Sequence, residues 1–205
     1  MEKVKHIYFD VGGVLIIDFT SNHGWRNLIS DLGFTKDNYD QFDSIWKQHA
    51  ERACLDYDID NLIPYYEQFL QKRFNSGYSL LIDIVSRCKK NHYIQQLLDI
   101  LENRYKLGLL TNMYPRMLNA IIEYKIFPTT HWDNIVDSST ICMQKPDLEI
   151  YLFAQEQTQV DPSNILFIDN LSENLIIPKK LGWQTFHYNS AQPKSSSCKL
   201  LELLS

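Results

Sequence analysis

The sequence lacks the features of an exported, membrane-spanning or nucleic-acid-binding protein. It shows no basic region followed by an apolar stretch at its start, and no window approaches the roughly 18 uninterrupted apolar residues of a membrane span. The formal net charge is −5, and lysine and arginine are scattered without a basic run. We therefore expect a cytoplasmic protein that binds neither a membrane nor nucleic acid.

The few cysteines are widely spaced, and this spacing argues against two roles that cysteines often have in small proteins. The four cysteines lie far apart and form no C-x-x-C pair, which argues against a zinc site and against a disulfide framework. We expect all of them to be reduced thiols. They are Cys54, Cys88, Cys142 and Cys198.

The size and composition predict a folded domain that carries an insertion. Hydrophobic residues make up 44% of the chain and charged residues 22%, which are ordinary values for a globular protein. The 205 residues exceed the length of one compact domain, for which about 150 residues is a soft expectation. One domain with a sizeable insertion fits this length best.

The apolar periodicity changes along the chain. Residues 6–9 form a short apolar and aromatic run that ends at Asp10 and Gly12-Gly13, as a buried strand does. From residue 25 to about residue 90, apolar residues recur at three- and four-residue spacing, which predicts amphipathic helices and no strand. The four predicted helices span residues 25–33, 39–50, 60–74 and 78–88.

After residue 91 helices and strands alternate. This order predicts a doubly wound α/β fold, a parallel sheet covered by helices on both faces, with a small inserted α-helical cap. We assign residues 1–18 and 91–205 to the α/β core and residues 19–90 to the cap. The predicted strands span residues 106–113, 165–170 and 183–188, and the predicted helices span residues 92–105, 115–125, 146–158 and 172–182. Residues 189–198 are predicted to form an exposed loop before a short final helix.

Polar residues stand where three of the predicted strands end. Asp10 follows the first strand, Thr111 and Asn112 end the second, and Asp169 and Asn170 end the third. In an open α/β sheet the ligand site lies outside the carboxyl ends of the strands. We therefore expect these side chains to meet at one site.

Four short motifs carry a resemblance to a known family. FDVGGVL, LLTNM, QKPD and FIDNLSEN occur in the order and roughly the spacing of the four motifs of the haloacid dehalogenase superfamily. The resemblance covers nearly the whole chain and is to the capped subfamily I type, which includes sugar-phosphate phosphatases and the phosphatase domain of epoxide hydrolase. It implies a Mg²⁺-dependent phosphohydrolase that acts on a small phosphorylated metabolite through an aspartyl-phosphate intermediate.

The resemblance also implies a role for each motif. Asp10 is similar to the family nucleophile, since a strand-end carboxylate can take up the phosphoryl group and divide one hard displacement into two easier ones. Lys145 resembles the lysine that offsets repulsion between the nucleophile and the phosphate dianion. The implied phosphate-binding residues are Gly12 and Gly13, through backbone N–H groups, with Thr111, Asn112 and Lys145.

The implied metal ligands are oxygen atoms, which suit Mg²⁺. They come from Asp10, the backbone carbonyl of Gly12, and the acidic fourth motif, where either Asp169 or Asn170 could reach the ion. The metal would neutralise charge on the transferring group.

Two positions depart from the family pattern. Family phosphatases commonly have a second aspartate two residues after the nucleophile, which acts as general acid and base, and here that residue is Gly12. The fourth motif commonly has two adjacent aspartates, and here the second is Asn170, so Asp169 or Glu173 would have to compensate for the missing charge. A catalytically weak or inactive member that binds a phosphorylated ligand or a protein partner is therefore the alternative, and a dehalogenase that attacks carbon is a weaker one.

The cap is expected to determine the substrate, because it closes over the phosphate site. Its candidate substrate-facing residues are His23, Trp25, Trp46, His49 and Arg52, although aromatic residues at helical spacing are more often core residues. The sequence determines neither the substrate nor the oligomeric state.

Overall fold

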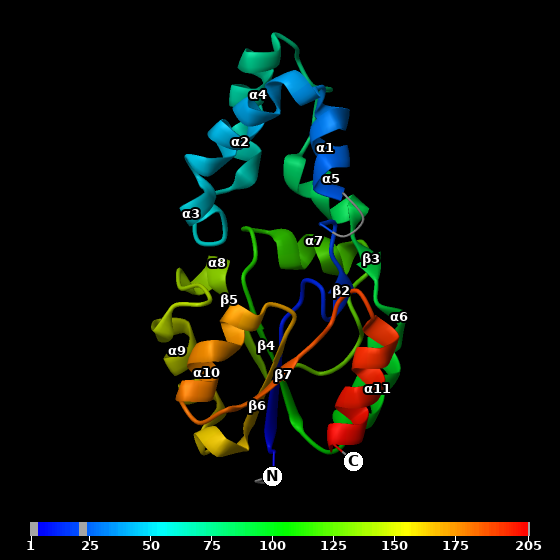
Figure 1. Ribbon diagram of the computed structural model, residues 1–205, viewed down its shortest axis with the longest axis vertical. Coiled ribbons are helices and arrows are strands. Elements are labelled where there is room, and N and C mark those ends of the chain that lie inside the picture. Colours follow the sequence, from blue (N-terminus) through cyan, green and yellow to red (C-terminus); the bar gives the residue numbers. More distant parts are fainter. Residues whose placement is uncertain (1–3, 21–23, 205) are drawn as a thin grey trace.

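A five-stranded parallel sheet forms the centre of the computed structural model, which describes residues 4–20 and 24–204 (Figure 1). The strand order is β5-β4-β1-β6-β7, and every neighbouring pair is parallel. This confirms the predicted doubly wound α/β class. The strands are β1 (His6–Phe9), β4 (Lys106–Thr111), β5 (Asn134–Asp137), β6 (Ile165–Asp169) and β7 (Gln184–His187).

Both faces of the sheet are buried, which explains why its central strands are continuous apolar runs. In β1, Ile7 and Phe9 belong to one apolar cluster, whereas Tyr8 between them belongs to a second cluster on the opposite face. The first cluster includes side chains of α6 (His92–Leu101), α7 (Met117–Glu123) and α11 (Pro193–Leu204). The second includes side chains of α9 (Leu148–Thr158) and of the segment around α10 (Ile176–Lys180).

The inserted helices stand over the carboxyl end of the sheet (Figure 1). No strand of the central sheet comes from the described residues of this insertion. Aromatic rings fill its interior, with Phe42 stacked on Tyr66 at 4.8 Å between ring centres and Phe34 edge-on to Phe42 at 5.4 Å. The helices are α1 (Gly24–Leu32), α2 (Tyr39–Lys47), α3 (Ala50–Ala53), α4 (Ile63–Leu70) and α5 (Leu80–Arg87).

A two-stranded antiparallel pair marks where the chain leaves the core and returns to it. Strand β2 (Ile16–Ile17) pairs with β3 (Lys89–Lys90). We keep the proposed boundaries of 1–18 and 91–205 for the core and 19–90 for the cap, because this pair lies at both of them. Residues 1–3, 21–23 and 205 within these ranges lie outside the described part.

The observed elements differ from the predicted ones in a few places. Strand β5 at the edge of the sheet was not predicted, and neither was the β2–β3 pair. The segment 189–198 is not a loop throughout, because α11 already begins at Pro193 and buries Ser196 and Ser197. The predicted helix 60–74 begins as a 3-10 turn, η3 (Ile59–Leu62), and α4 ends before Gln71, which has a left-handed backbone with φ of 49°.

The remaining helical turns are short. They are η2 (Lys36–Asn38), α8 (Ser138–Ile141), η4 (Pro162–Asn164) and η5 (Ser172–Leu175). Among the residues described, we find no helix with the length and apolar character needed to cross a membrane. All four cysteines are free thiols in the structure.

Candidate active site

Asp10 follows β1 at the carboxyl edge of the sheet. Its backbone N–H donates to the carbonyl of Ile168 in the neighbouring strand β6 at 2.9 Å, so the sheet pairing continues to this residue. The side chain is buried, with 8% of the residue exposed. Because β4 and β6 flank β1, their last residues Thr111 and Asp169 end at the same edge. The strand ends therefore converge as the topology rule requires.

A buried lysine joins two carboxylates at this edge. The Nζ atom of Lys145 lies 3.0 Å from Oδ1 of Asp10 and 2.7 Å from Oδ2 of Asp169, and the lysine side chain is only 1% exposed. Asp169 is fully buried and also accepts hydrogen bonds from the backbone N–H of Leu171 at 2.7 Å and from the amide of Asn174 at 3.0 Å. One ammonium faces two carboxylates, so the buried cluster carries a net charge of −1 when all three groups are ionised.

This imbalance shifts the ionisation of the cluster. Burial, assisted by the charge of Asp169, raises the pKa of Asp10 to about 6, although Lys145 opposes the shift. Burial on its own would lower the pKa of Lys145, but the two neighbouring carboxylates outweigh it and raise that pKa. Lys145 therefore stays a cation, and Asp10 takes up a proton at a higher pH than an ordinary aspartate does.

Asn112 holds the backbone of Lys145. Its amide nitrogen donates to the Lys145 carbonyl at 2.8 Å, and its amide oxygen accepts from the Lys145 N–H, also at 2.8 Å. The sequence prediction assigns Asn112 to the phosphate. Both ends of its amide are turned to the lysine backbone instead, so this residue is placed to position Lys145.

Thr111 presents a hydroxyl that has no hydrogen-bond partner among the described residues. The residue is fully buried at the end of β4, and its Oγ1 atom is inaccessible to solvent. A buried hydroxyl without a partner is costly, by about 1–3 kcal/mol. A phosphate oxygen at the strand edge would supply the missing partner.

The amide of Asn170 lies between two oxygen atoms, the carbonyl oxygen of Gly12 and Oδ2 of Asp10. One terminal atom of this amide lies 2.9 Å from the Gly12 carbonyl oxygen and 3.3 Å from Oδ2 of Asp10. With nitrogen at this position, the amide donates to both oxygens. After a half-turn of the amide, three oxygens would meet at one point, which is the hard donor set that Mg²⁺ prefers.

The residues present therefore fit a magnesium ion. Asn170, rather than Asp169, would be its ligand from the fourth motif, together with Asp10. The oxygens of Asp169 are instead engaged by Lys145, Asn174 and the Leu171 N–H. In the described part of the chain, no group of three or more histidine, cysteine, aspartate or glutamate side chains could hold a metal. The fit to Mg²⁺ therefore depends on the backbone carbonyl of Gly12, the side-chain amide of Asn170 and a single carboxylate, that of Asp10.

Gly13 makes room for this amide. Its φ is +77°, and a Cβ atom there would lie 2.6 Å from one terminal atom of the Asn170 amide, which is far too close. Its N–H donates to the Ile16 carbonyl at 2.9 Å. The predicted contact between the Gly13 N–H and phosphate is therefore corrected, because that donor closes the loop after β1.

A small cavity next to Gly13 and Asn170 is lined by an acidic residue that the four motifs do not include. The cavity has a volume of about 100 Å³, and its lining includes Gly13, Asp18, Asn91 and Asn170. Asp18 follows β2 directly and belongs to none of the four motifs. One signal in the sequence could have identified Asp18. It is an acidic residue that directly follows the short apolar run after Gly12 and Gly13.

Polar and aromatic contacts join the cap to the core, in addition to the apolar cluster that includes side chains of both. Arg116, just before α7, pairs with Asp58 at 2.6 Å and with Asp60 at 2.9 Å. The hydroxyl of Ser138 in α8 donates to the carbonyl of Cys54. The ring of Trp46 stands edge-on to Tyr114, 5.9 Å away between ring centres. The cap therefore covers the edge of the sheet in this structure.

The predicted substrate-facing residues of the cap are mostly occupied elsewhere. His23 lies outside the described residues. Trp25 and Trp46 pack edge-on at 5.0 Å, His49 stacks on the Tyr57 ring at 4.3 Å, and Arg52 forms an exposed ion pair with Asp56. The packing of the two tryptophans is that of a structural aromatic core.

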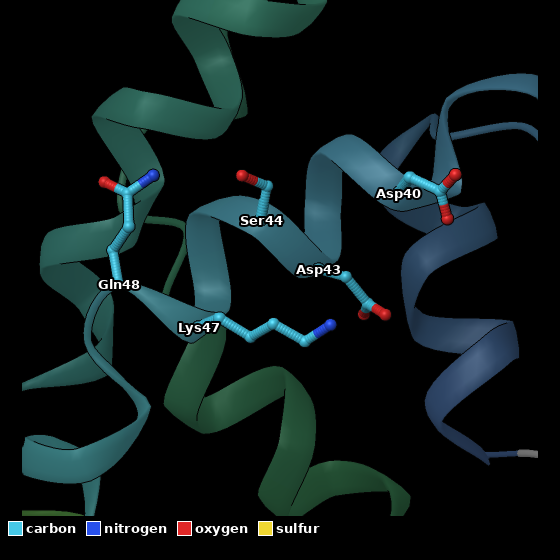
Figure 2. A pocket seen from close by; sticks show the side chains of 5 residues that line it. All are labelled: Asp40, Asp43, Ser44, Lys47 and Gln48. Atoms are coloured by element: carbon cyan, nitrogen blue, oxygen red, sulfur yellow. The ribbon is translucent and has the colours of Figure 1, made fainter.

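A larger hollow on the cap surface shows no comparable chemistry. Its volume is about 490 Å³, and its lining side chains come from α2 and the residue that follows it (Figure 2). These side chains are Asp40, Asp43, Ser44, Lys47 and Gln48. They belong to one helix and its end, so this hollow does not combine groups from several elements as the strand edge does.

Comparison with known proteins finds a curated relative and several solved structures of the same fold. A β-phosphoglucomutase of Bacillus subtilis (strain 168) is 25% identical over 199 residues, which cover 93% of this chain and 85% of that protein. A haloacid dehalogenase family enzyme from Bacteroides thetaiotaomicron, crystallised with magnesium and inorganic phosphate, superposes with a TM-score of 0.72 at 22% identity, over 91% of this chain and 95% of that one. A haloacid dehalogenase-like hydrolase from Porphyromonas gingivalis has the same TM-score at 18% identity, over 97% and 98% of the two chains.

These structural likenesses show the fold, and the family follows from the sequence. Residues 4–171 match the family described as haloacid dehalogenase-like hydrolase, which is most of the chain. The predicted resemblance and the prediction of a hydrolytic enzyme are confirmed by this match. The chain belongs to the haloacid dehalogenase-like hydrolase family.

Proposed function

We propose that the protein is a Mg²⁺-dependent phosphohydrolase that acts on a small phosphorylated metabolite through an aspartyl-phosphate on Asp10. One observation carries this proposal. The two carboxylate oxygens of Asp10 face different partners, Oδ1 facing the buried ammonium of Lys145 and Oδ2 facing the amide of Asn170 beside the Gly12 carbonyl. A carboxylate between a fixed ammonium and a set of oxygens that suit Mg²⁺ is placed to attack a phosphate dianion that Lys145 and the metal would bind.

Each residue of the chain then has a distinct task. Asp10 attacks phosphorus in line and becomes the aspartyl-phosphate. Lys145 offsets the repulsion between this carboxylate and the incoming dianion, and Asp169 and Asn112 hold the lysine in place from its side chain and its backbone. The hydroxyl of Thr111 donates to a phosphate oxygen.

The metal would be held by Oδ2 of Asp10, the Gly12 carbonyl and the amide oxygen of Asn170. When bound, Mg²⁺ supplies positive charge that neutralises the transferring phosphoryl group. This ligand set is supported by the distances of 2.9 Å and 3.3 Å from the Asn170 amide to the other two groups. The magnesium and phosphate in the Bacteroides thetaiotaomicron enzyme support the same choice of ion.

We propose a sugar phosphate as the first substrate class to examine. The support is the relative from Bacillus subtilis, whose name, β-phosphoglucomutase, describes an enzyme of phosphorylated glucose. Contacts from Arg116, Ser138 and Tyr114 hold the cap over the site, which favours a small substrate rather than a macromolecule.

A second function stays open, that of a weakly active or inactive homologue that binds a phosphorylated ligand. Two observations favour it. Gly12 supplies no acid, and the amide of Asn170 brings no charge to the metal site. Binding of inorganic phosphate without turnover of any phosphate ester would support this alternative.

The test is a screen of phosphorylated metabolites, sugar phosphates included, with Mg²⁺ and with a chelator in its place. We expect Mg²⁺-dependent release of phosphate by the wild-type protein and a loss of several orders of magnitude in Asp10→Asn, which keeps the shape but removes the nucleophile. Asp40→Asn, on the exposed surface of the cap, is the matched control and should stay fully active. Activity that persists in Asp10→Asn would refute the nucleophile, and no activity in any well would refute the phosphohydrolase.

A further inference from the structure

We infer that Asp18 is the general acid and base of this site and stands in for the side chain that residue 12 lacks. The inference rests on the proposed phosphohydrolase function. It assigns to a residue outside the four motifs the proton transfers that Gly12 cannot perform.

The space beside Gly12 leads directly to Asp18. A Cβ atom built on Gly12 would have Oδ2 of Asp18 as its nearest neighbour at 3.7 Å and the Cβ of Asp18 next at 3.9 Å. Among the described residues, no other atom beyond the chain neighbours of Gly12 lies within 4 Å of it. The carboxylate of Asp18 is therefore within one side-chain length of the place where a carboxylate on residue 12 would lie.

The backbone around Asp18 explains this position. Gly12 and Ile16 form a bridge, and Ile16 and Ile17 pair with Lys90 and Lys89, so the chain folds back over the loop that follows the nucleophile. Asp18 comes directly after this pair. A residue eight positions beyond Asp10 in the sequence is thereby brought over Gly12.

The orientation of the carboxylate is also defined. Its Oδ1 atom accepts hydrogen bonds from the backbone N–H of Thr20 at 2.9 Å and from the Thr20 hydroxyl at 2.5 Å. Its other oxygen, Oδ2, is the one that approaches Gly12. One oxygen is thus held by Thr20 while the second is directed to the loop that carries the nucleophile.

Asp18 shares a cavity with Asn170, one of the three proposed metal ligands. Both line the cavity of about 100 Å³ together with Gly13, and the amide of Asn170 reaches Asp10 itself. Asp18 is partly exposed, so a substrate and water can reach it. The leaving group of an ester bound at Asp10 would then lie on this side of the site.

The two proton transfers follow from this placement. In the first step an oxygen of Asp10 bonds to phosphorus, the bond from phosphorus to the ester oxygen breaks, and protonated Asp18 gives its proton to that oxygen, which leaves as an alcohol. In the second step water attacks the aspartyl-phosphate, the Asp18 carboxylate accepts a proton from the water, and the bond between phosphorus and Asp10 breaks. The products are inorganic phosphate, free Asp10 and protonated Asp18.

The experiment compares two substrates that differ in their need for an acid. An alkyl phosphate, taken as the best substrate of the screen, has a poor leaving group, whereas para-nitrophenyl phosphate leaves as a stabilised phenolate. In Asp18→Asn we expect kcat/KM for the alkyl phosphate to fall by about 100-fold or more and for the aryl phosphate by less than about 10-fold, since general acid catalysis contributes roughly 10²–10⁴-fold. Asp40→Asn should leave both values unchanged.

Two further measurements distinguish a catalytic role of Asp18 from a merely structural one. Without the base, the aspartyl-phosphate of Asp18→Asn should accumulate with para-nitrophenyl phosphate, seen as a burst of nitrophenolate and as one added phosphoryl group in the mass of the quenched protein. Gly12→Asp in the Asp18→Asn background should restore alkyl phosphate turnover, because a Cβ atom on residue 12 would meet no described atom beyond its chain neighbours closer than 3.7 Å.

The outcomes distinguish this inference from the function on which it rests. Unchanged turnover in Asp18→Asn, or an equal loss on both substrates without accumulation of phosphorylated protein, would overturn the role of Asp18 and leave the phosphohydrolase intact. A wild-type protein that hydrolyses neither substrate in Mg²⁺ would overturn both, and would be recognised before any variant is made.

Discussion

Two carboxylates meet one lysine at the strand edge, and they differ in exposure. Asp169 is fully buried and accepts hydrogen bonds from a lysine, an amide and a backbone N–H. Asp10 also meets the lysine and an amide, but 8% of this residue stays exposed. A nucleophile has to be reached by the phosphate that it attacks. We therefore propose Asp10 as the reacting carboxylate and Asp169 as the residue that holds Lys145.

Asn170→Asp tests the proposed metal ligands at the residue scale. The substitution adds a negative charge beside Oδ2 of Asp10, so we expect Mg²⁺ to bind about 10-fold more tightly, as measured by titration calorimetry. Without metal the same charge repels Asp10 and the amide donor is lost, so the free energy of unfolding should fall by about 1–3 kcal/mol.

Asn174→Asp is the matched control for this prediction. Its amide faces Asp169 rather than Asp10, so an added charge there should also destabilise the metal-free protein but should leave the Mg²⁺ affinity nearly unchanged. Equal gains in affinity for the two variants, or none for Asn170→Asp, would show that Asn170 is not a ligand.

At the scale of elements, the cap and the core share one apolar cluster, and a few polar contacts add to this packing. Arg116 is left-handed, with φ of 71°, and its guanidinium reaches both Asp58 and Asp60 of the cap. Asp60 also accepts from the hydroxyl of Ser79 and the N–H of Leu81 at the start of α5. The arginine therefore connects α7 of the core to the segment that begins α4 and α5.

Arg116→Gln should loosen the cap without unfolding the core. The guanidinium is half exposed, so its loss should cost only about 1 kcal/mol or less of unfolding free energy. The expected result is faster amide hydrogen exchange in residues 54–62, with exchange in β1, β4 and β6 unchanged. Arg73→Gln is the control, because Arg73 pairs with Glu67 within the cap. Equal protection in wild type and Arg116→Gln would mean that other contacts hold the cap closed.

For the whole molecule, the charge cluster makes stability depend on pH. The pKa of Asp10 is raised to about 6 in the fold, above its ordinary value of 3.8. Between these values the unfolded chain is ionised while the folded protein keeps its proton, so folding stability from this group is fully present below about pH 4 and is lost as the pH rises through 6. A tenfold change in proton affinity corresponds to about 1.4 kcal/mol, so the loss amounts to about 3 kcal/mol.

Asp10→Asn should abolish this loss. In a chelator, its free energy of unfolding should exceed that of the wild type by a margin that grows from near zero at about pH 4 to about 3 kcal/mol at about pH 7, measured by urea denaturation. Addition of Mg²⁺ should stabilise the wild type and not the variant, since ligand binding adds RT ln(1 + [L]/Kd). Parallel pH profiles in chelator would contradict the assignment of the raised pKa to Asp10.

The parallel sheet, the meeting of its strand-end residues and the helical insertion could be predicted from the sequence alone. The continuous apolar runs of β1, β4 and β6 predict a parallel sheet, because strands buried on both faces need apolar residues throughout. The polar residues after these runs then have to meet at one edge, which brings Asp10, Thr111 and Asp169 together through topology alone. The helical spacing of the insertion predicts the cap in the same way.

The tertiary structure decided what local patterns cannot encode. Strand β5 pairs with β4 alone, and Ile135 within it is 54% exposed, so its four residues carry no buried run that would identify a strand. The partners of Asn112, Gly13 and Arg116 lie 33 to 157 positions away in the chain. Asp18 likewise approaches Gly12 because of how β2 folds back over the loop. The spacing of apolar residues predicts which face of a helix or strand is buried. The hydrogen-bond partner of a polar atom depends instead on how segments far apart in the sequence pack together.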